Sequence, residues 1–405
     1  MSFAVLALAY LRRRWGQALF SVVVGALGIA AVTIALVGFD ALPKAAQRAW
    51  GGVDLVVGPK GSALDLVLCC ALHVSDPRGL ISMKDAMQAV SNPMIRAAAP
   101  IALGDNVEGW RIMGTTPAIM DVYRAKIATG QMWSDKLQAV LGASTARALN
   151  FKIGDSFVGA HGLAAGGDLH DKFPYKVVGI LQPTGSALDR LVLTDIETVR
   201  YVHIEQAKAE IAEHGSTDEE NVANLPNAAT AIVASYRVPT AAAFMPRQID
   251  ATENLSAGSP TFEIARLMSY ARPLTVAVTA LGLLLVVIAA LAAALGLMAT
   301  MNARTRDLAL LRALGASRSK IAIVAFAEAG IVAMAALILG GVLTAGLSAL
   351  SQDLLAETTG LLLEPHLGID RIAAILGGTI LVAVAAASFP ALRAMHTQIE
   401  ELLQL

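Results

Sequence analysis

Four long runs without a charged side chain constrain this sequence most. They cover residues 15–39, 273–303, 329–352 and 372–392. A helix needs about 20 apolar residues to cross the hydrocarbon layer of a bilayer, and each run meets that length. The whole chain is only 16% charged, whereas an average soluble domain carries about 25% charged residues. The sequence therefore predicts four transmembrane helices.

The region between the first and second runs has a soluble composition, with mixed charges and frequent Pro and Gly. Short apolar and β-branched stretches predict strands at 53–57, 139–142, 175–181, 190–194 and 229–235. Segments with helical character lie at 82–90, 143–150 and 194–213. The predicted fold is membrane α-helical, with a large α+β extracytoplasmic domain inserted between the first and second spans.

Basic residues are distributed unevenly around the runs. Three arginines occupy positions 12–14, five basic residues lie between 304 and 320, and Arg393 follows the fourth run. The loop between the third and fourth runs is acidic instead, with Asp353, Glu357, Glu364 and Asp370. Because basic residues collect on the cytoplasmic side, both termini are predicted to be cytoplasmic.

These observations divide the chain into nine segments. In order they are a cytoplasmic N-terminal segment (1–17), the first span (18–42), the extracytoplasmic domain (43–270), the second span (274–299), a cytoplasmic coupling loop (301–318), the third span (320–350), a short extracytoplasmic loop (351–370), the fourth span (371–393) and a cytoplasmic tail (394–405).

Residues 1–47 could instead be a cleaved signal peptide. The apolar stretch of about 25 residues is longer than the usual 7–15, which favours a retained anchor.

The cytoplasmic loop reads MNARTRDLALLRALGASRSKIAIV over residues 301–324. A short helix there would place leucines on one side and charges on the other, with Gly315 ending it. Such a helix suits docking into a groove of a partner, although a plain basic loop at the membrane surface fits equally well. The candidate docking residues are Arg304, Arg306, Asp307, Leu308, Leu311, Arg312, Leu314 and Gly315.

This loop resembles the coupling segment of MacB/FtsX-like permeases, the membrane subunits of a class of ABC transporters. The stretch VLGASTARALNFKIGDSF at 140–157 is similar to a conserved pattern of that family, and FPALRAM at 389–395 resembles its exit from the last span. One departure is Asp307, where the family usually has Glu. The arrangement of one span, a large outer domain and three further spans matches as well.

The resemblance implies a non-catalytic permease in the inner membrane of a bacterium. It would act as a homodimer, or with a paralogous permease, bound to a cytoplasmic ABC ATPase dimer that holds ATP and Mg²⁺. ATP hydrolysis would then move the outer domain, with membrane lipids and a periplasmic cargo-binding protein as further partners. The alternatives are an FtsX-like signalling module that regulates a periplasmic or cell-wall enzyme, and a membrane-anchored enzyme or receptor without an ATPase.

Motifs for catalysis or nucleotide binding are not recognisable in the sequence. The stretch VVGPKGSA at 56–63 is a near miss of the phosphate-binding loop, since Lys60 follows Pro59 and no Ser or Thr follows it directly. Neither HExxH nor GxSxG occurs. The formal net charge of −1 gives no reason to expect a nucleic-acid partner. Any ATP is therefore expected to bind to a partner chain.

Two polar features stand out. The stretch HGLAAGGDLHD gathers His161, Asp168, His170 and Asp171 in one Gly-rich loop, and such ligands suit zinc. The alternative is a solvated loop with incidental histidines.

Glu328 lies about two turns into the third span. Carboxylates within a membrane are costly and often functional. We expect Glu328 to reach headgroups or cap the coupling loop, with proton relay as the alternative.

Overall fold

The computed structural model describes residues 12, 15–162, 167, 169–214, 227–303, 317–358 and 368–396. By its internal contacts the chain divides after Leu42 and after Met268. The two parts are a helix bundle and an inserted domain, which comprises residues 43–268, and each is described by itself.

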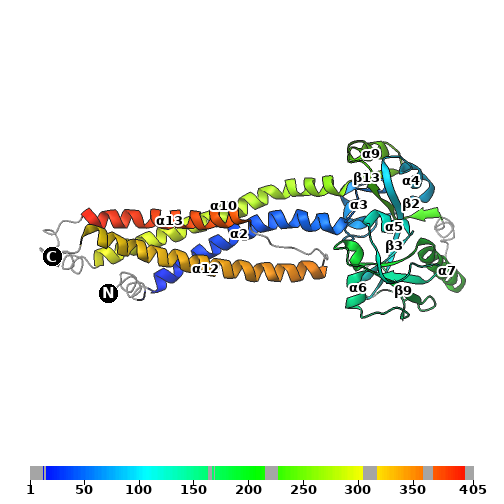
Figure 1. Cartoon of the computed structure of the whole chain (residues 1–405), viewed down its shortest axis with the longest axis horizontal. Coiled ribbons are helices and arrows are strands. Elements are labelled where there is room, and N and C mark those ends of the chain that lie inside the picture. Colours follow the sequence, from blue (N-terminus) through cyan, green and yellow to red (C-terminus); the bar gives the residue numbers. More distant parts are fainter. Residues whose placement is uncertain are drawn as a thin grey trace. The chain divides into compact units, whose positions relative to one another are not determined.

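The bundle contains four long helices in the described part of the chain (Figure 1). They are α2 (Trp15–Trp50), α10 (Pro260–Ala303), α12 (Arg318–Thr358) and α13 (Ile369–His396). Each includes a stretch that is long and apolar enough to cross a membrane. The predicted four spans are therefore confirmed, together with the placement of a large domain between the first and the second.

Small residues let the helices of the bundle approach closely. An added Cβ at Gly28 of α2 would lie 2.6 Å from the carbonyl oxygen of Gly282 in α10. Gly340 of α12 is similarly close to α2, since its added Cβ would lie 3.1 Å from the Ala26 carbonyl oxygen. Dispersion contacts and close backbone approach are the main attraction between helices in lipid, which explains why so many small residues lie here. Arg371 of α13 adds an ion pair with Asp40 of α2.

The inserted domain is built on one mixed sheet, which has eleven strands among the described residues. Its main path runs β13-β1-β12-β3-β4-β10-β6-β9-β5, while β7 pairs with β9 and β8 with β3. The strands are β1 (Leu55–Pro59), β3 (Ile95–Val107), β4 (Trp110–Thr115), β5 (Ile127–Gly130), β6 (Gln138–Leu141), β7 (Ser156–Phe157), β8 (Ala160–His161), β9 (Tyr175–Leu181), β10 (Val192–Asp195), β12 (Ala231–Tyr236) and β13 (Leu255–Gly258). A separate pair is formed by β2 (Ile81–Ser82) and β11 (Ala228–Ala229).

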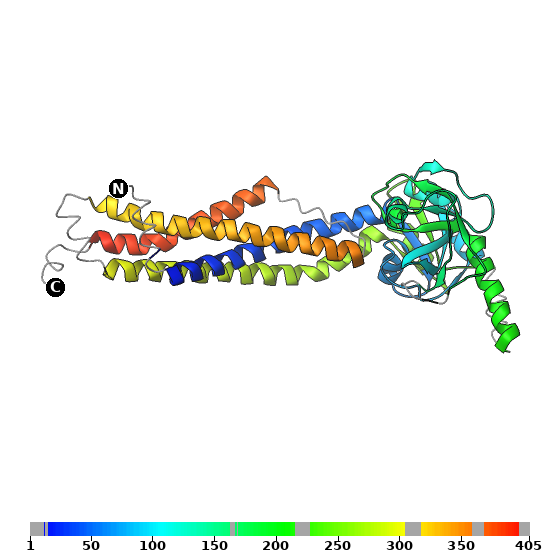
Figure 2. The same cartoon turned by 90° about the horizontal axis from the view of Figure 1, so that it is seen from below.

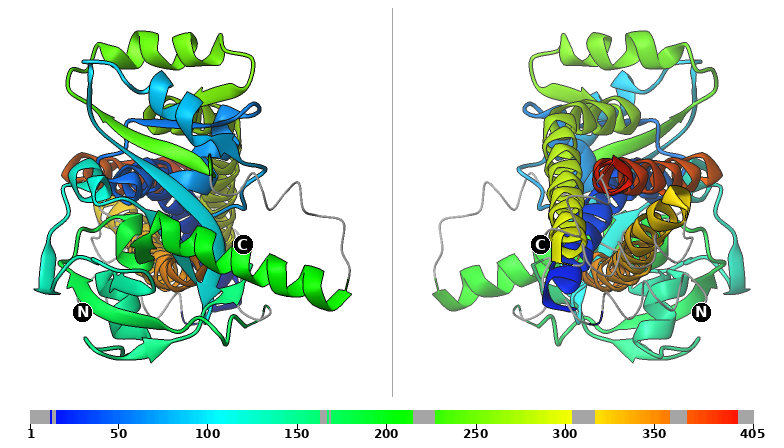
Figure 3. Two further views of the ribbon diagram at one scale, coloured as in Figure 1. Left: turned by 90° about the vertical axis from the view of Figure 1, so that its right-hand side faces the viewer. Right: turned by 90° about the vertical axis from the view of Figure 1, so that its left-hand side faces the viewer.

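Short helices accompany this sheet. They are α3 (Ala63–Cys70), α4 (Met83–Ala89), α5 (Ala118–Tyr123), α6 (Ala143–Ala148), the 3₁₀ turn η1 (Ala187–Arg190), α7 (Ile196–His214) and α9 (Ala241–Asp250). The five predicted strands correspond to β1, β6, β9, β10 and β12, and the three predicted helices to α4, α6 and α7. The later turns of α7 extend past the edge of the sheet (Figures 2 and 3).

The core of the inserted domain includes the outer ends of two bundle helices. Ala46, Ala49 and Trp50 of α2 are buried in its largest hydrophobic cluster, and Ile264 of α10 joins the same cluster. Each of these segments belongs to the same continuous helix as its span. The segments of α2 and α10 that belong to the inserted domain are therefore part of its core.

Candidate metal centre and family

Three histidines and one aspartate meet in the inserted domain. Oδ1 of Asp105 lies 3.1 Å from Nε2 of His170, 3.3 Å from Nε2 of His203 and 3.8 Å from Nδ1 of His161. Asp105, His161 and His203 each offer one ligand atom, and these three atoms all lie within 4.8 Å of one another. Imidazole nitrogens and carboxylate oxygens are ligands that zinc takes in proteins. This cluster is the strongest candidate site in the part of the chain that the structure describes.

An irregularity in β3 places Asp105. The pairing of β3 with β4 shifts register between Leu103 and Asp105, and such a bulge re-aims the side chain that follows it. On the other edge of β3, Asp105 is paired directly with His161 of β8. The amide of Gly162 donates a 2.7 Å hydrogen bond to the Gly104 carbonyl, which ties the end of β8 to the same position.

The other two histidines come from separate segments. His203 is on α7, which packs across β3 and β4, and it approaches the backbone of β3 at Gly104. An added Cβ at Gly104 would lie only 3.2 Å from Nε2 of His203, so a small residue is needed there. His170 follows the isolated bridge between Ala160 and Leu169, and its amide donates a 2.8 Å hydrogen bond to the Gly159 carbonyl.

The cluster runs from the interior to the surface. The side chains of Asp105 and His170 are fully buried, that of His203 is 21% exposed and that of His161 is 59% exposed. Burial by itself raises the pKa of Asp105, but the hydrogen bonds and charges of His170 and His203 outweigh it and lower that pKa to about 2. Oδ2 of Asp105 is buried and accepts no hydrogen bond from the residues described. The carboxylate is therefore charged and not fully satisfied.

Tyr175 lies close enough to this carboxylate to feel its charge. Its ring is buried and stacks on Phe157 with a centroid separation of 5.3 Å. Burial, together with the charge of Asp105, raises the pKa of the Tyr175 hydroxyl, which therefore stays protonated at neutral pH. Because the side chains of Asp105 and His170 are fully buried, electrostatic interactions between them are stronger than they would be in water.

The zinc loop predicted from the sequence contributes only part of this cluster. His161 and His170 are present in it, Asp171 is exposed and is not among its members, and Asp168 lies outside the described residues. Sequence reasoning missed Asp105 as a ligand and did not connect His203 to the loop. Neither residue has a metal-like spacing to the loop in the sequence, and only sheet pairing and helix packing bring them there. Zinc binding stays a prediction.

The other predicted sites have different outcomes. The coupling residues Arg304, Arg306, Asp307, Leu308, Leu311, Arg312, Leu314 and Gly315 lie outside the described residues. Glu328 of α12 is only 3% exposed and is therefore turned into the bundle. That burial does not favour contact with lipid headgroups, whereas capping of the coupling loop and proton relay stay predictions.

The near miss of a phosphate-binding loop has a structural role. Nζ of Lys60 donates hydrogen bonds to the carbonyl oxygens of Asp250, the last residue of α9, at 2.6 Å and of Thr252, two residues further on, at 2.8 Å. A lysine there satisfies helix-end carbonyls and opposes the negative end of the helix dipole. Ser62 caps α3 by accepting a hydrogen bond from the Asp65 amide. The charged and polar groups of this motif are therefore used within the domain.

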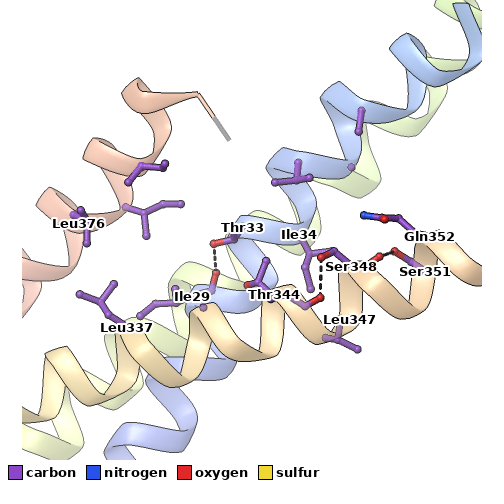
Figure 4. A pocket seen from close by; sticks show the side chains of 17 residues that line it. Ile29, Thr33, Ile34, Leu337, Thr344, Leu347, Ser348, Ser351, Gln352 and Leu376 are labelled. Carbon is purple, nitrogen blue, oxygen red and sulfur yellow. Dashed lines mark hydrogen bonds between the residues drawn. The ribbon is translucent and has the colours of Figure 1, made fainter. Parts of the chain in front are cut away.

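The bundle contains a cavity of about 410 Å³ between α2, α12 and α13 (Figure 4). Most of its wall is apolar, and its hydroxyl groups bond to carbonyls of their own helices. Thr33 donates to the Ile29 carbonyl at 2.7 Å, and Thr344 donates to the Gly340 carbonyl at 2.8 Å. These two hydroxyls have already found acceptors, so the cavity offers an apolar surface rather than a chemical site.

Comparison with known families agrees with this architecture. A model of the MacB-like periplasmic core domain matches residues 18–249, which is more than half of the chain. A model of the FtsX-like permease C-terminal region matches residues 279–399. The chain belongs to the MacB/FtsX-like permease family. The resemblance inferred from the loop at 301–324 and from 140–157 is thereby confirmed, and the permease is an ABC transporter membrane subunit by family.

One solved structure that is similar to the permease is the extracellular domain of the noncanonic ABC-type transporter YknZ from Gram-positive bacteria. The match has 10% sequence identity and a TM-score of 0.28, and it covers 51% of the permease and 98% of the YknZ chain. A search of curated proteins finds no match to the permease.

Proposed function

We propose that the permease couples ATP hydrolysis by a separate cytoplasmic ABC ATPase to movement of its inserted domain in the periplasm, for export or extraction of a cargo. The observation that supports this most is the continuity of α2 and α10. Each is one helix that begins or ends in the hydrophobic core of the inserted domain. A continuous helix carries a displacement from one end to the other more directly than a flexible linker does.

The proposed orientation follows from the charges. The basic residues near the spans fall on one side if both termini are in the cytoplasm of a bacterium and the inserted domain is outside the inner membrane. The coupling loop at 301–318 is then on the cytoplasmic side, where an ATPase dimer can reach it. The family usually acts as a dimer, so we propose that two copies, or one copy and a paralogous permease, share the ATPase pair.

In this proposal the permease itself does no chemistry. ATP and Mg²⁺ are held by the ATPase, and closure of its two subunits displaces the coupling loops. The spans shift, and α2 and α10 carry the shift into the inserted domain. The cargo does not have to cross the bundle, because the work is done on the outer side of the membrane.

Co-purification with the partner ATPase tests the proposal. The full chain would be expressed with the ABC ATPase encoded nearest to it, and both complex formation and ATP turnover would be measured. Arg306→Glu and Leu311→Asp should abolish the complex, because they reverse the charged face and disrupt the apolar face of the coupling segment. Lys320→Glu, an exposed basic residue beyond the segment, is the matched control.

Two results would contradict the proposal. One is a complex and an ATP turnover that Arg306→Glu and Leu311→Asp leave unchanged. The other is an ATPase that binds while the inserted domain keeps one conformation with and without ATP. The FtsX-like signalling alternative is separated by the outer partner: a stable complex with a cell-wall hydrolase whose activity changes with ATP would favour signalling over transport.

A further inference from the structure

We propose that Asp105, His161 and His203 form an exchangeable zinc site on the inserted domain, with His170 holding Asp105 in position. The four residues lie on β3, β8, α7 and the segment before β9, so that one ion would join separate parts of the domain. This inference does not depend on the proposed coupling to an ATPase.

The distances between the ligand atoms fit a shared ion. Zinc binds nitrogen and oxygen at about 2.0–2.1 Å in a tetrahedron, which places neighbouring ligand atoms about 3.3–3.4 Å apart. Oδ1 of Asp105 lies 3.3 Å from His203 and 3.8 Å from His161. The ring centroids of His161 and His203 are 5.4 Å apart at an interplanar angle of 76°, so the rings converge edge-on instead of stacking. Small side-chain rotations would complete the geometry.

Hydrogen bonding alone gives a weaker account of this cluster. His161 at 3.8 Å is too far from Asp105 for a hydrogen bond. Three imidazoles nevertheless surround one carboxylate oxygen, while the second oxygen, Oδ2, accepts no hydrogen bond from the described residues. In a buried carboxylate with a purely structural role, both oxygens would be expected to accept hydrogen bonds. A divalent cation held between the imidazole nitrogens and the carboxylate would place a compensating positive charge beside both of its oxygens.

His170 fits a supporting role. It is fully buried, and its Nε2 is 3.1 Å from Oδ1 of Asp105. It is not one of the three residues whose ligand atoms lie mutually within 4.8 Å. A hydrogen bond from a second layer fixes the orientation of a ligating carboxylate, and its loss typically lowers metal affinity about 10–100-fold. His170 is therefore a positioning residue for Asp105.

The exposure of the ligands indicates that the ion exchanges with solvent. Asp105 closes the inner side of the site, whereas His161 is 59% exposed and forms its rim. Three protein ligands leave the fourth tetrahedral position to water or to a ligand from another molecule, as in zinc sites that stay open. The site would thus accept zinc from, or pass it to, a donor outside the domain.

Zinc binding to the full chain tests this proposal. The protein would be purified in detergent with a tag that contains no histidine, stripped with a chelator and titrated with Zn²⁺ against a competing chromophoric chelator. Co²⁺ in place of Zn²⁺ would report tetrahedral coordination through its visible absorption. We expect one Zn²⁺ per chain. His161→Ala and His203→Ala should each weaken binding by at least about 100-fold, and His170→Ala by about 10–100-fold.

Matched controls keep the test decisive. Asp171→Asn alters an exposed acidic neighbour of His170, and His214→Ala removes a histidine about three turns further along α7; both should bind zinc like the wild type. Since His161 is exposed, His161→Ala should fold normally even if Asp105→Asn does not. The proposal is overturned if the wild type retains no zinc, or if His161→Ala and His203→Ala bind it as tightly as the controls.

Discussion

Replacing Gly28 by alanine should force α2 and α10 apart. The added methyl group would lie 2.6 Å from the carbonyl oxygen of Gly282 and 2.9 Å from Cγ2 of Val286. The carbonyl belongs to the backbone of α10 and has no rotamer through which to move away. The two helices must therefore separate, and the contacts around them are lost.

The magnitude follows from comparing two glycines of the same helix. An added Cβ at Gly38 meets nothing within 4 Å. Both substitutions gain the same helix propensity, about 1 kcal/mol for Gly→Ala, so this gain cancels in the difference between them. What remains is the cost of overpacking, which is about 1–3 kcal/mol in a well-packed interior. Gly28→Ala should be less stable than Gly38→Ala by that amount.

The difference can be measured on the purified full chain. Unfolding in mixed micelles would be followed by circular dichroism as the fraction of dodecyl sulfate rises, because most of the helical signal comes from the bundle. Gly282→Ala, whose added Cβ would lie 2.7 Å from Val32 and 2.9 Å from the Gly28 carbonyl oxygen, should behave like Gly28→Ala. If Gly28→Ala and Gly38→Ala unfold together, the close crossing of α2 and α10 is refuted.

Two further predictions concern the inserted domain. Gln47 is exposed on the outer part of α2, and Gln47→Pro breaks that helix at a cost of about 3 kcal/mol. It should leave ATPase binding intact but abolish ATP-dependent movement of spin labels in the domain, with Gln47→Ala as control; normal movement would argue against transmission through α2. Burial lowers the pKa of His73 to about 3 from 6.5, so the unfolded chain takes up a proton below pH 6.5 and the folded domain does not. The free energy of unfolding should therefore fall as the pH drops from 6.5 towards 3, by up to about 1.4 kcal/mol per pH unit. His73→Asn, which suits the φ of +55° at this position, should remove this contribution in urea titrations at pH 7 and 5; an unchanged pH dependence would show that His73 is not its source.

The extent to which the sequence predicts the structure differs between local elements and the candidate metal centre. The spans could be predicted because a membrane helix satisfies its backbone hydrogen bonds internally, and the requirement for about 20 apolar residues is local. The strand at 175–181 and the helix beginning near 194 were likewise visible from local patterns, and β9 and α7 confirm them. For such elements the decisive interactions lie within a few residues of one another.

The candidate metal centre is different, because its residues are distant in the chain. Asp105 precedes His170 by 65 residues, and nothing in the local sequence distinguishes it from other aspartates. It reaches the histidines because β3 shifts register at that point and β8 pairs beside it. A regular strand register would turn the next side chain towards the histidines instead.

The sequence by itself determined which four segments are long and apolar enough to cross a membrane and to which family the permease belongs. Only the tertiary structure decided which polar residues act together. Lys60, which resembled part of a phosphate-binding loop, binds carbonyl oxygens at the C-terminal end of α9. His203, which had no partner in the sequence, joins Asp105 and His161. The reason is physical: hydrophobicity acts through local composition, whereas a ligand cluster depends on angstrom-scale distances that pairing and packing set between remote segments.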